Sequence, residues 1–245
     1  MIKMKETDKK LVNGIKDYFD KAGLKKAVLG ISGGVDSAVT AALAVKAIGK
    51  ENVIGLSMPH LEISSPESII DAKNLCNQLD IKLIEIPINK LENAMDLDIP
   101  WEQSKLASAN TKARLRAVLL YNYANSNKAL VLGTSNKTEI KLGYFTKYGD
   151  GAVDFEVIGG LYKTEVVKLA KHLNIPYAII TKTPSAELMK GQTDEQEIGA
   201  PYSEVDKILK EIEAGKTPET EIGKKIAKMI KDNKHKTEML PVLKV

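Results

Sequence analysis

The apolar residues of this chain follow two spacings that alternate along the sequence. Short, mostly apolar runs, each bounded by turn residues, are typical of strands in a parallel sheet. Four such runs lie at residues 27–31, 52–58, 81–86 and 128–132. Segments with helical spacing precede and separate them, at residues 6–21, 39–48, 65–79 and 111–124. This alternation predicts an α/β fold with a doubly wound parallel sheet, which binds ligands at the carboxyl ends of its strands.

The second half of the chain mixes further helices with long polar segments. Helical spacing returns in three segments, at residues 164–173, 203–214 and 219–231. Three other segments are less regular and predict loops or, in the first, a short helix: residues 89–109, 142–160 and 181–192. Long loops inside a compact domain are usually functional. We therefore expect extra C-terminal helices, mobile lids at residues 91–109 and 183–200, and a single domain over residues 1–245.

Composition narrows the class of protein. The 245 residues carry a formal net charge of +4, which suits an anionic small molecule at least as well as nucleic acid. Cys76 is the only cysteine, so an internal disulfide and a paired-cysteine zinc or redox motif are excluded. We see neither a bilayer-spanning apolar stretch nor the apolar region of a signal peptide. We expect a cytoplasmic protein that binds small molecules rather than membranes or nucleic acid.

The first predicted strand leads into the sequence Ser-Gly-Gly-Val-Asp-Ser, and a helical pattern follows at once. A strand, a glycine turn and a helix together direct backbone N–H groups at an anion. Ser32 and Ser37 add hydroxyl donors, and the two glycines let the backbone approach phosphate oxygens closely. The loop is neither a Walker loop nor the glycine motif of dinucleotide folds. An acid would repel phosphate, so Asp36 indicates a bound cation.

This loop resembles the pyrophosphate loop of the ATP-pyrophosphatase families, which split ATP between its α and β phosphates. A second motif, Gly-Thr-Ser-Asn-Lys-Thr-Glu, occupies residues 133–139, just after the strand predicted at 128–132. Both turns belong to the carboxyl edge of a parallel sheet, so we expect them to share one site. Glu139 and Asp36, with phosphate oxygens and water, would then provide the oxygen ligands that Mg²⁺ prefers.

Several motifs in this order resemble the NAD synthetase family of the ATP-pyrophosphatase superfamily. Besides the two turns, they comprise residues 110–116, 143–151 and 161–166, then His235 and Lys236. The resemblance implies an adenine nucleotide alpha-hydrolase-like fold, a homodimer, and synthesis of NAD from deamido-NAD and ammonia. ATP, the co-substrate, would adenylate the nicotinate carboxylate with Mg²⁺ bound and release pyrophosphate; ammonia would then displace AMP. The segment before the first strand is too short for the amidase domain of a glutamine-dependent version.

The resemblance also assigns roles to individual residues. Asp36 and Glu139 would hold Mg²⁺, and Lys163 would counter charge on the α-phosphate, so these three form the expected catalytic set. The residues matched to ATP are Gly30, Ile31, Ser32, Gly33, Gly34, Val35, Asp36, Ser37, Thr134, Lys163 and Ser185. The residues matched to deamido-NAD are Arg114, Lys147, Asp154, His235 and Lys236. Arginine and lysine suit a pyrophosphate, and aspartate suits a ribose or an amine.

Two other functions stay open at this point. A different pyrophosphate-loop enzyme, such as a tRNA-thiolating or GMP-synthetase-type ligase, would share the first motif. Thiolation usually needs more sulfur than one cysteine supplies, and the chain has no obvious RNA-binding appendage. A nucleotide-binding regulator without activity would share the fold, although the retention of Asp36, Glu139 and Lys163 argues against it.

Overall fold

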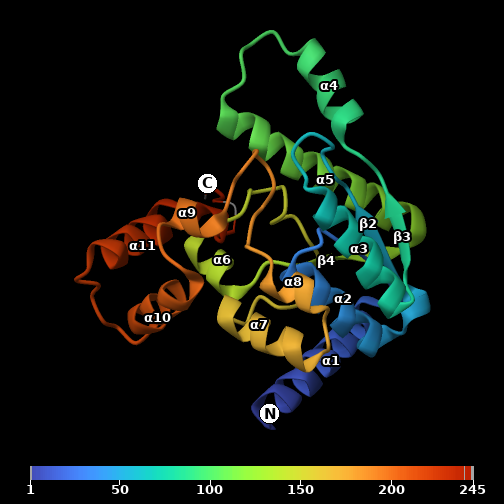
Figure 1. Cartoon of the computed structure of the whole chain (residues 1–245), viewed down its shortest axis with the longest axis horizontal. Coiled ribbons are helices and arrows are strands. Elements are labelled where there is room, and N and C mark those ends of the chain that lie inside the picture. The colour runs from blue at the N-terminus through green and yellow to red at the C-terminus, as the bar shows by residue number, and fades with distance from the viewer. Residues whose placement is uncertain (1, 240, 244–245) are drawn as a thin grey trace.

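The computed structural model describes residues 2–239 and 241–243, with a parallel sheet at the centre (Figure 1). The strands are β1 (Lys26–Gly30), β2 (Val53–Ser57), β3 (Lys82–Glu85), β4 (Ala129–Gly133) and β5 (Phe155–Glu156). Their order is β3-β2-β1-β4-β5, and every pairing is parallel. The predicted doubly wound sheet is confirmed. Its strand order changes direction between β1 and β4, which is where such sheets bind ligands.

The fifth strand, β5, was not predicted, because its segment has the polar, glycine-rich composition of a loop. β5 consists of 2 residues, too few to produce an alternating or unbroken apolar pattern. It is defined by its neighbour: Phe155 pairs with Leu132 and Glu156 pairs with Gly133 of β4. The segment 142–160, which the sequence predicted to be rich in loops, therefore contains one short strand.

Helices surround the sheet on both faces. They are α1 (Ile2–Ala22), α2 (Val35–Ile48), α3 (Pro66–Leu79), α4 (Asn89–Asp98), α5 (Lys105–Asn127), α6 (Lys137–Leu142), α7 (Lys163–His172), α8 (Tyr177–Thr181), α9 (Asp194–Ile198), α10 (Tyr202–Glu213) and α11 (Glu221–Asp232). Two short 3-10 helices are η1 (Lys50–Asn52) and η2 (Lys234–Lys236). None of the described helices combines the length and apolar character of a membrane span.

The segments predicted to be irregular contain more helix than their composition suggests. Residues 89–109 hold the short helix α4 and the first turn of α5, so the predicted start of that helix at residue 111 is too late. The Ser104 hydroxyl caps α5 by accepting from the Ala107 N–H at 3.1 Å, and this local hydrogen bond explains the earlier start. The segment 183–200 likewise contains α9.

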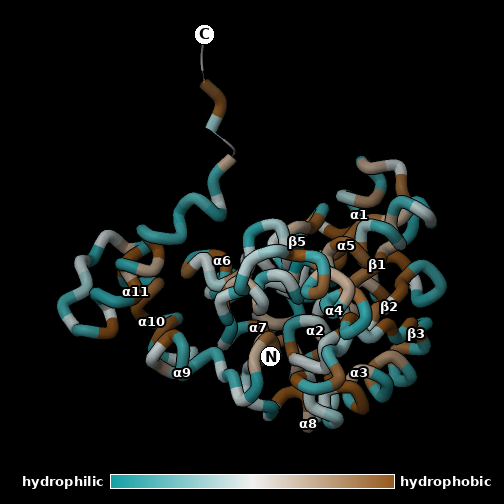
Figure 2. The backbone as a smooth tube through the Cα atoms, turned by 90° about the horizontal axis from the view of Figure 1, so that it is seen from above, coloured by the Kyte–Doolittle hydropathy of each residue, from teal (hydrophilic) through white to brown (hydrophobic). Residues whose placement is uncertain are grey.

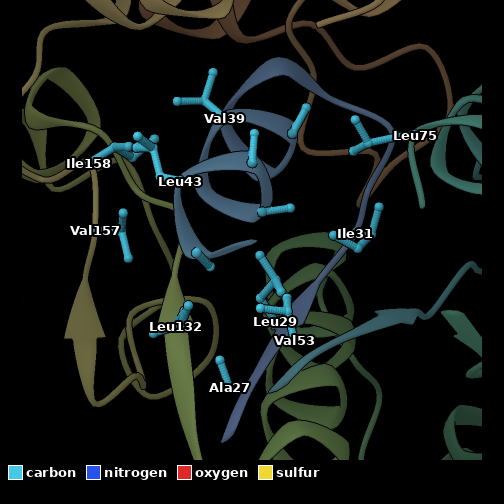
Figure 3. Close-up of a cluster of buried hydrophobic side chains, with 14 of the residues drawn as sticks. Ala27, Leu29, Ile31, Val39, Leu43, Val53, Leu75, Leu132, Val157 and Ile158 are labelled. Atoms are coloured by element: carbon cyan, nitrogen blue, oxygen red, sulfur yellow. The ribbon is translucent and has the colours of Figure 1, made fainter. Parts of the chain in front are cut away.

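Each face of the sheet packs against its own set of helices. Leu29 and Leu132 point toward α2, in a core that also includes side chains of α1, α3 and α7 (Figure 3). Val28 and Val131 point to the other face, where α5 covers them. Val28, Leu29 and Val131 are fully buried, as expected for central strands of a parallel sheet covered on both sides.

The helix α2, which follows the glycine loop, is buried around most of its circumference. Its small side chains, among them Ala38, Ala41 and Ala44, are inaccessible to solvent and permit close approach to the sheet. Close packing on several sides restricts movement of a helix. The start of α2, where the glycine loop ends, is therefore held rigidly.

A third apolar cluster lies beside the sheet and joins α6, α9, α10 and α11 (Figures 1 and 2). Its buried members include Leu142, Ile198, Val205 and Ile226. These are the predicted extra C-terminal helices. The described residues 237–239 and 241–243 extend away from the rest of the molecule (Figure 2).

The helix α4 and its link to α5 form an arm at one end of the molecule (Figure 1). A buried group of charges fixes the base of this arm. Glu92 of α4 has one carboxylate oxygen 2.7 Å from Lys112 Nζ of α5 and the other 2.9 Å from His60 Nε2. All three side chains are almost inaccessible to solvent. Lys112 Nζ also donates to Ser108 Oγ at 2.7 Å.

Replacement of Glu92 by alanine would leave the Lys112 ammonium buried without its carboxylate. Loss of one partner from a buried ion pair costs about 3–5 kcal/mol, so we expect the free energy of unfolding of Glu92→Ala to fall by about that amount. Urea titration measures this change. Exposed Glu102 on the same arm provides the control, and Glu102→Ala should change the free energy by less than about 0.5 kcal/mol. Equal effects of the two substitutions would contradict the role given to the cluster.

Candidate active site

The glycine loop between β1 and α2 lies at the carboxyl edge of the sheet and is held by its own hydroxyl groups. Ser37 Oγ donates to the Gly34 carbonyl at 3.0 Å and accepts from the Ser32 N–H at 3.3 Å. Gly33 has φ +77°, and a Cβ there would lie 2.3 Å from the backbone oxygen of Ser68. Only glycine fits this position without strain. The loop thus packs directly against the start of α3.

The second motif meets the loop through Asn136, which follows β4. The Asn136 side-chain amide donates to Asp36 Oδ1 at 3.0 Å, although the two residues are 100 positions apart. Asn136 also caps α6, because its Oδ1 accepts from the Glu139 N–H at 3.0 Å and Glu139 Oε2 accepts from the Asn136 N–H at 3.2 Å. One asparagine therefore orients both carboxylates of the predicted metal site.

Lys163, at the start of α7, completes this group of charges. Its Nζ donates to Asp36 Oδ2 and lies 3.5 Å from Glu139 Oε1 and 5.0 Å from the ring of Tyr202. Burial by itself would lower the pKa of Lys163, but the two carboxylates outweigh it and raise that pKa. Burial raises the pKa of Glu139, Asp36 adds repulsion, and Lys163 opposes both. Asp36 and Glu139 are partly buried and face a single ammonium, so a further positive charge, either a proton on Glu139 or a metal cation, would be stabilised here.

A cavity of about 300 Å³ opens from the glycine loop toward α5. Every residue matched to ATP lines it except Gly33. Thr134 lies in the turn after β4, and Ser185 reaches the cavity from the segment after α8, where its hydroxyl donates to the Gln192 carbonyl at 2.7 Å. The fold therefore brings the residues matched to ATP from four separate segments to one cavity, as expected at the switch point of a doubly wound sheet.

Hydrogen bonds link the segments that carry four of the five residues matched to deamido-NAD, although none of the four lines this cavity. Arg114 donates through Nε and Nη2 to the backbone oxygen of Lys147, both at 3.3 Å. Lys147 Nζ in turn donates to the backbone oxygen of His235 at 2.7 Å. Lys236 Nζ donates to the carbonyls of Gly143 and Phe145 at 2.7 and 2.8 Å. The C-terminal segment is thereby joined to the glycine-rich loop and to α5.

The fifth residue, Asp154, has different partners in the described part of the chain. Its carboxylate accepts from the Val131 N–H at 2.8 Å and from the Tyr121 hydroxyl at 3.1 Å. Its backbone oxygen accepts from the Tyr18 hydroxyl at 2.7 Å. These contacts tie the start of β5 to β4, α5 and α1, so the structure does not bring Asp154 together with the other four.

The cavity also contains charged residues to which the sequence motifs gave no role. Arg116 donates through Nε to the Met58 carbonyl at 2.9 Å, and Lys182 and Glu187 lie between the loop and α3. Asp194 of α9 is buried and accepts from the Tyr202 hydroxyl at 3.0 Å. Helical spacing placed Arg114 and Arg116 on different faces but did not indicate which face meets the cavity. Asp194 and Lys182 lie in irregular segments that carry no periodic signal.

A family model described as NAD synthase matches residues 8–240. The chain belongs to the NAD synthase family. Two curated relatives named NH(3)-dependent NAD(+) synthetase are similar over almost their whole length. The one from Methanosarcina mazei is 44% identical and the alignment covers 98% of each chain. The one from Archaeoglobus fulgidus is 46% identical, over 94% of this chain and 93% of the relative.

Solved structures of NAD synthase relatives share the fold. A structure of NMN synthetase from Francisella tularensis superposes with a TM-score of 0.92 at 35% identity, over 99% of both chains. The NH3-dependent NAD synthetase from Campylobacter jejuni, in complex with the nitrate ion, gives a TM-score of 0.85 at 32% identity, over 98% of this chain and 99% of that one. The predicted fold and the predicted family are confirmed.

The fit of Gly33 against Ser68 predicts a measurable difference in stability between two glycine substitutions. Alanine at a positive φ costs roughly 1–2 kcal/mol, and at Gly33 the clash with the Ser68 backbone adds to that cost. Gly23 also has a positive φ, +65°, but among the described residues beyond its chain neighbours no atom lies within 4 Å of where its Cβ would stand. We expect Gly33→Ala to lower the free energy of unfolding by more than Gly23→Ala, as measured by urea titration. Equal losses would mean that the loop and α3 can separate freely.

Proposed function

We propose that this chain is an ammonia-dependent NAD synthetase that converts deamido-NAD, ATP and ammonia to NAD, AMP and pyrophosphate. The observation that supports this most directly is the meeting of Asp36, Glu139 and Lys163 at the end of the glycine loop. A phosphate loop that adjoins two carboxylates and a lysine suits attack on a phosphate and needs no protein nucleophile.

The chemistry explains why ATP is needed. A carboxylate resists amide formation because its leaving group would be oxide. When the nicotinate carboxylate attacks the α-phosphorus of ATP, the bond to the β-phosphate breaks and pyrophosphate leaves. Ammonia then attacks the carbonyl carbon, AMP departs with the bonding electrons, and the nitrogen loses a proton. The protein's part is to hold the two reactants in line and to neutralise charge on the phosphates.

We propose specific roles for the residues around the loop. The glycine loop over residues 30–37, with the hydroxyls of Ser32, Ser37 and Thr134, binds the ATP phosphates, and Ser185 contacts ATP from its own segment. Lys163 neutralises the charge that develops on the α-phosphate. Because it contacts Asp36 and Glu139 as well, its ammonium stays oriented toward the reacting phosphate.

We propose that Asp36 and Glu139 hold Mg²⁺ together with phosphate oxygens. The fit is supported by the single ammonium that faces these two carboxylates, since an additional cation would balance their charge. Mg²⁺ in nucleotide sites is usually held by one or two carboxylates plus substrate phosphates, which is the set available here. When bound, the metal would withdraw charge from the phosphate oxygens.

We propose that Arg114, Lys147, His235 and Lys236 contact deamido-NAD, because cationic side chains from three segments converge beside the cavity. Asp154 belongs to the same proposal. Its carboxylate already accepts two hydrogen bonds, and its remaining lone pairs can accept from a ribose hydroxyl or an amine.

A second function calls for the same test, since the Francisella tularensis structure is named NMN synthetase and superposes at a TM-score of 0.92. Under that alternative, this chain would amidate nicotinate mononucleotide with the same adenylation chemistry. The curated relatives at 44% and 46% identity are named NAD synthetases, and this favours deamido-NAD.

The deciding assay supplies the purified protein with Mg-ATP, ammonium and either deamido-NAD or nicotinate mononucleotide. We expect NAD, AMP and pyrophosphate in equal amounts, with the amide formed only when ammonium is present. Release of ADP and phosphate, or turnover that requires RNA, would refute the proposal. Faster turnover of the mononucleotide at equal concentration would replace it with the second function.

Neutralising either carboxylate should weaken the metal site while the fold survives. We expect Asp36→Asn and Glu139→Gln to lower kcat by about a hundred-fold, equivalent to about 3 kcal/mol of lost transition-state stabilisation. Chelation of Mg²⁺ should abolish wild-type turnover. Exposed Asp20 on α1 gives the matched control, and Asp20→Asn should keep wild-type kcat. Unchanged kcat in both site variants at saturating Mg²⁺ would refute the metal assignment.

We propose that the protein forms a homodimer through the arm of α4 and α5. Leu97, Trp101 and Leu106 on this arm are 86, 63 and 68% exposed, and large apolar side chains grouped on a surface favour association. Sedimentation should give a dimer for the wild type and a monomer for the double variant Leu97→Asp with Trp101→Asp. A variant that stays dimeric would place the interface elsewhere.

We also propose that residues 1–245 act as one cytoplasmic domain. The C-terminal helices support this, because Asp194 of α9 lines the same cavity as the glycine loop. The cavity is thus lined by the sheet region and by the C-terminal helices. A cytoplasmic location fits an enzyme that uses ATP.

A further inference from the structure

A second lysine, Lys182, reaches the glycine loop from a different element than Lys163. It directly follows α8, and its Nζ donates to the backbone oxygen of Gly33 at 3.1 Å. Its side chain also lines the cavity. Lys163 contacts the loop three positions later, at Asp36. An ammonium group therefore stands at each end of the segment that would receive the phosphates.

Polar contacts to α3 hold Lys182 in this position. Its Nζ pairs with Asp71 and lies 3.4 Å from Ser68 Oγ. The Ser68 hydroxyl is buried and donates to Glu187 Oε1 at 2.7 Å. Gly33 itself lies against Ser68, because a Cβ on Gly33 would clash with the Ser68 backbone. The contacts of Lys182 are therefore grouped around Gly33.

We propose that Lys182 binds the β- and γ-phosphates of ATP and stabilises the departing pyrophosphate, an assignment that rests on the proposed ATP-dependent function. Phosphates bound by the N–H groups after Gly33 come within reach of an ammonium that touches that residue. As the bond between the α- and β-phosphates breaks, its electron pair passes to the pyrophosphate oxygen. Negative charge builds up on the pyrophosphate as this bond breaks. A fixed positive charge beside it therefore stabilises the transition state more than the ground state.

Lys182 can bind a phosphate if the phosphate replaces one of its present partners, and the exposure of those contacts indicates which one. An ammonium has three N–H donors, and Gly33, Ser68 and Asp71 occupy all three. The ion pair with Asp71 is the partly exposed contact, with side chains 24 and 15% accessible. A phosphate carries more negative charge than a carboxylate and can replace Asp71. The contacts to Gly33 and Ser68 then keep the ammonium aimed at the loop.

A purely structural role for Lys182 makes a different prediction. If the ion pair with Asp71 only fastened the segment after α8 to α3, removal of either partner would have the same effect. If Lys182 binds phosphate, removal of the lysine removes a ligand, whereas removal of Asp71 removes a competitor. The variants Lys182→Gln and Asp71→Asn break the same ion pair with little change in shape, so they separate the two roles.

The experiment measures binding in the presence of Mg²⁺ by calorimetry, without turnover, for pyrophosphate, α,β-methylene-ATP and AMP. We expect Lys182→Gln to weaken binding of the first two about ten- to hundred-fold, the usual range for a charge-assisted hydrogen bond, and to leave AMP binding unchanged. Asp71→Asn should bind pyrophosphate at least as tightly as the wild type. Lys182→Arg should recover most of the loss, because it restores the charge.

Equal weakening by Lys182→Gln and Asp71→Asn, or no weakening by Lys182→Gln, would overturn the assignment. Weakened AMP binding would do so as well, since AMP lacks the phosphates in question. Should Lys182→Gln fail to fold, the comparison of Lys182→Arg with Asp71→Asn decides, because only the ligand role predicts tight pyrophosphate binding by both. The proposed function is tested separately by wild-type turnover, so its failure is distinct from failure of the Lys182 assignment.

Discussion

The site depends on a small group of charges that cannot be separated without leaving one of them unpaired. Asp36, Glu139 and Lys163 come from three elements and share one solvent-poor space, and Asn136 orients both carboxylates. A buried charge without a partner is costly, so each member confines the others. The glycine loop, the turn after β4 and the start of α7 consequently have one mutual arrangement.

The same group explains how a site of mixed charge can receive a highly charged nucleotide. Its two carboxylates can stabilise a bound cation, and its lysine can stabilise a bound phosphate. The group can therefore stabilise both ions at the same time. The neighbouring contacts of Lys182 repeat this pattern, because Asp71 offers a carboxylate to an ammonium beside the loop. Under the proposed site assignments, protein charges of both signs would exchange partners when substrate binds, and the ion pairs keep these charges paired before it does.

The fold and the centre of the site could be predicted because their signals are local. A strand, two glycines and a helix within twelve residues predict the phosphate loop, and parallel strands bring the motif at 133–139 to the same edge. Residues positioned by distant contacts gave no such signal. The sequence predicts that Arg116 lies on a helix, but not that its side chain faces the cavity. Asp194 lines the cavity because α9 packs on the C-terminal cluster. β5 is too short for a sequence pattern and is defined by its pairing with β4.

The two outer strands of the sheet have a consequence for how copies of the protein can associate. β3 presents Lys82 and Glu85 as exposed ends around two half-buried residues, and β5 offers only 2 residues. Short edges flanked by charge give an incoming strand too little backbone to pair with, which protects a sheet from joining another sheet edge to edge. Growth into extended β-sheets is thereby disfavoured, and the helices and loops are left as the surfaces through which copies can associate.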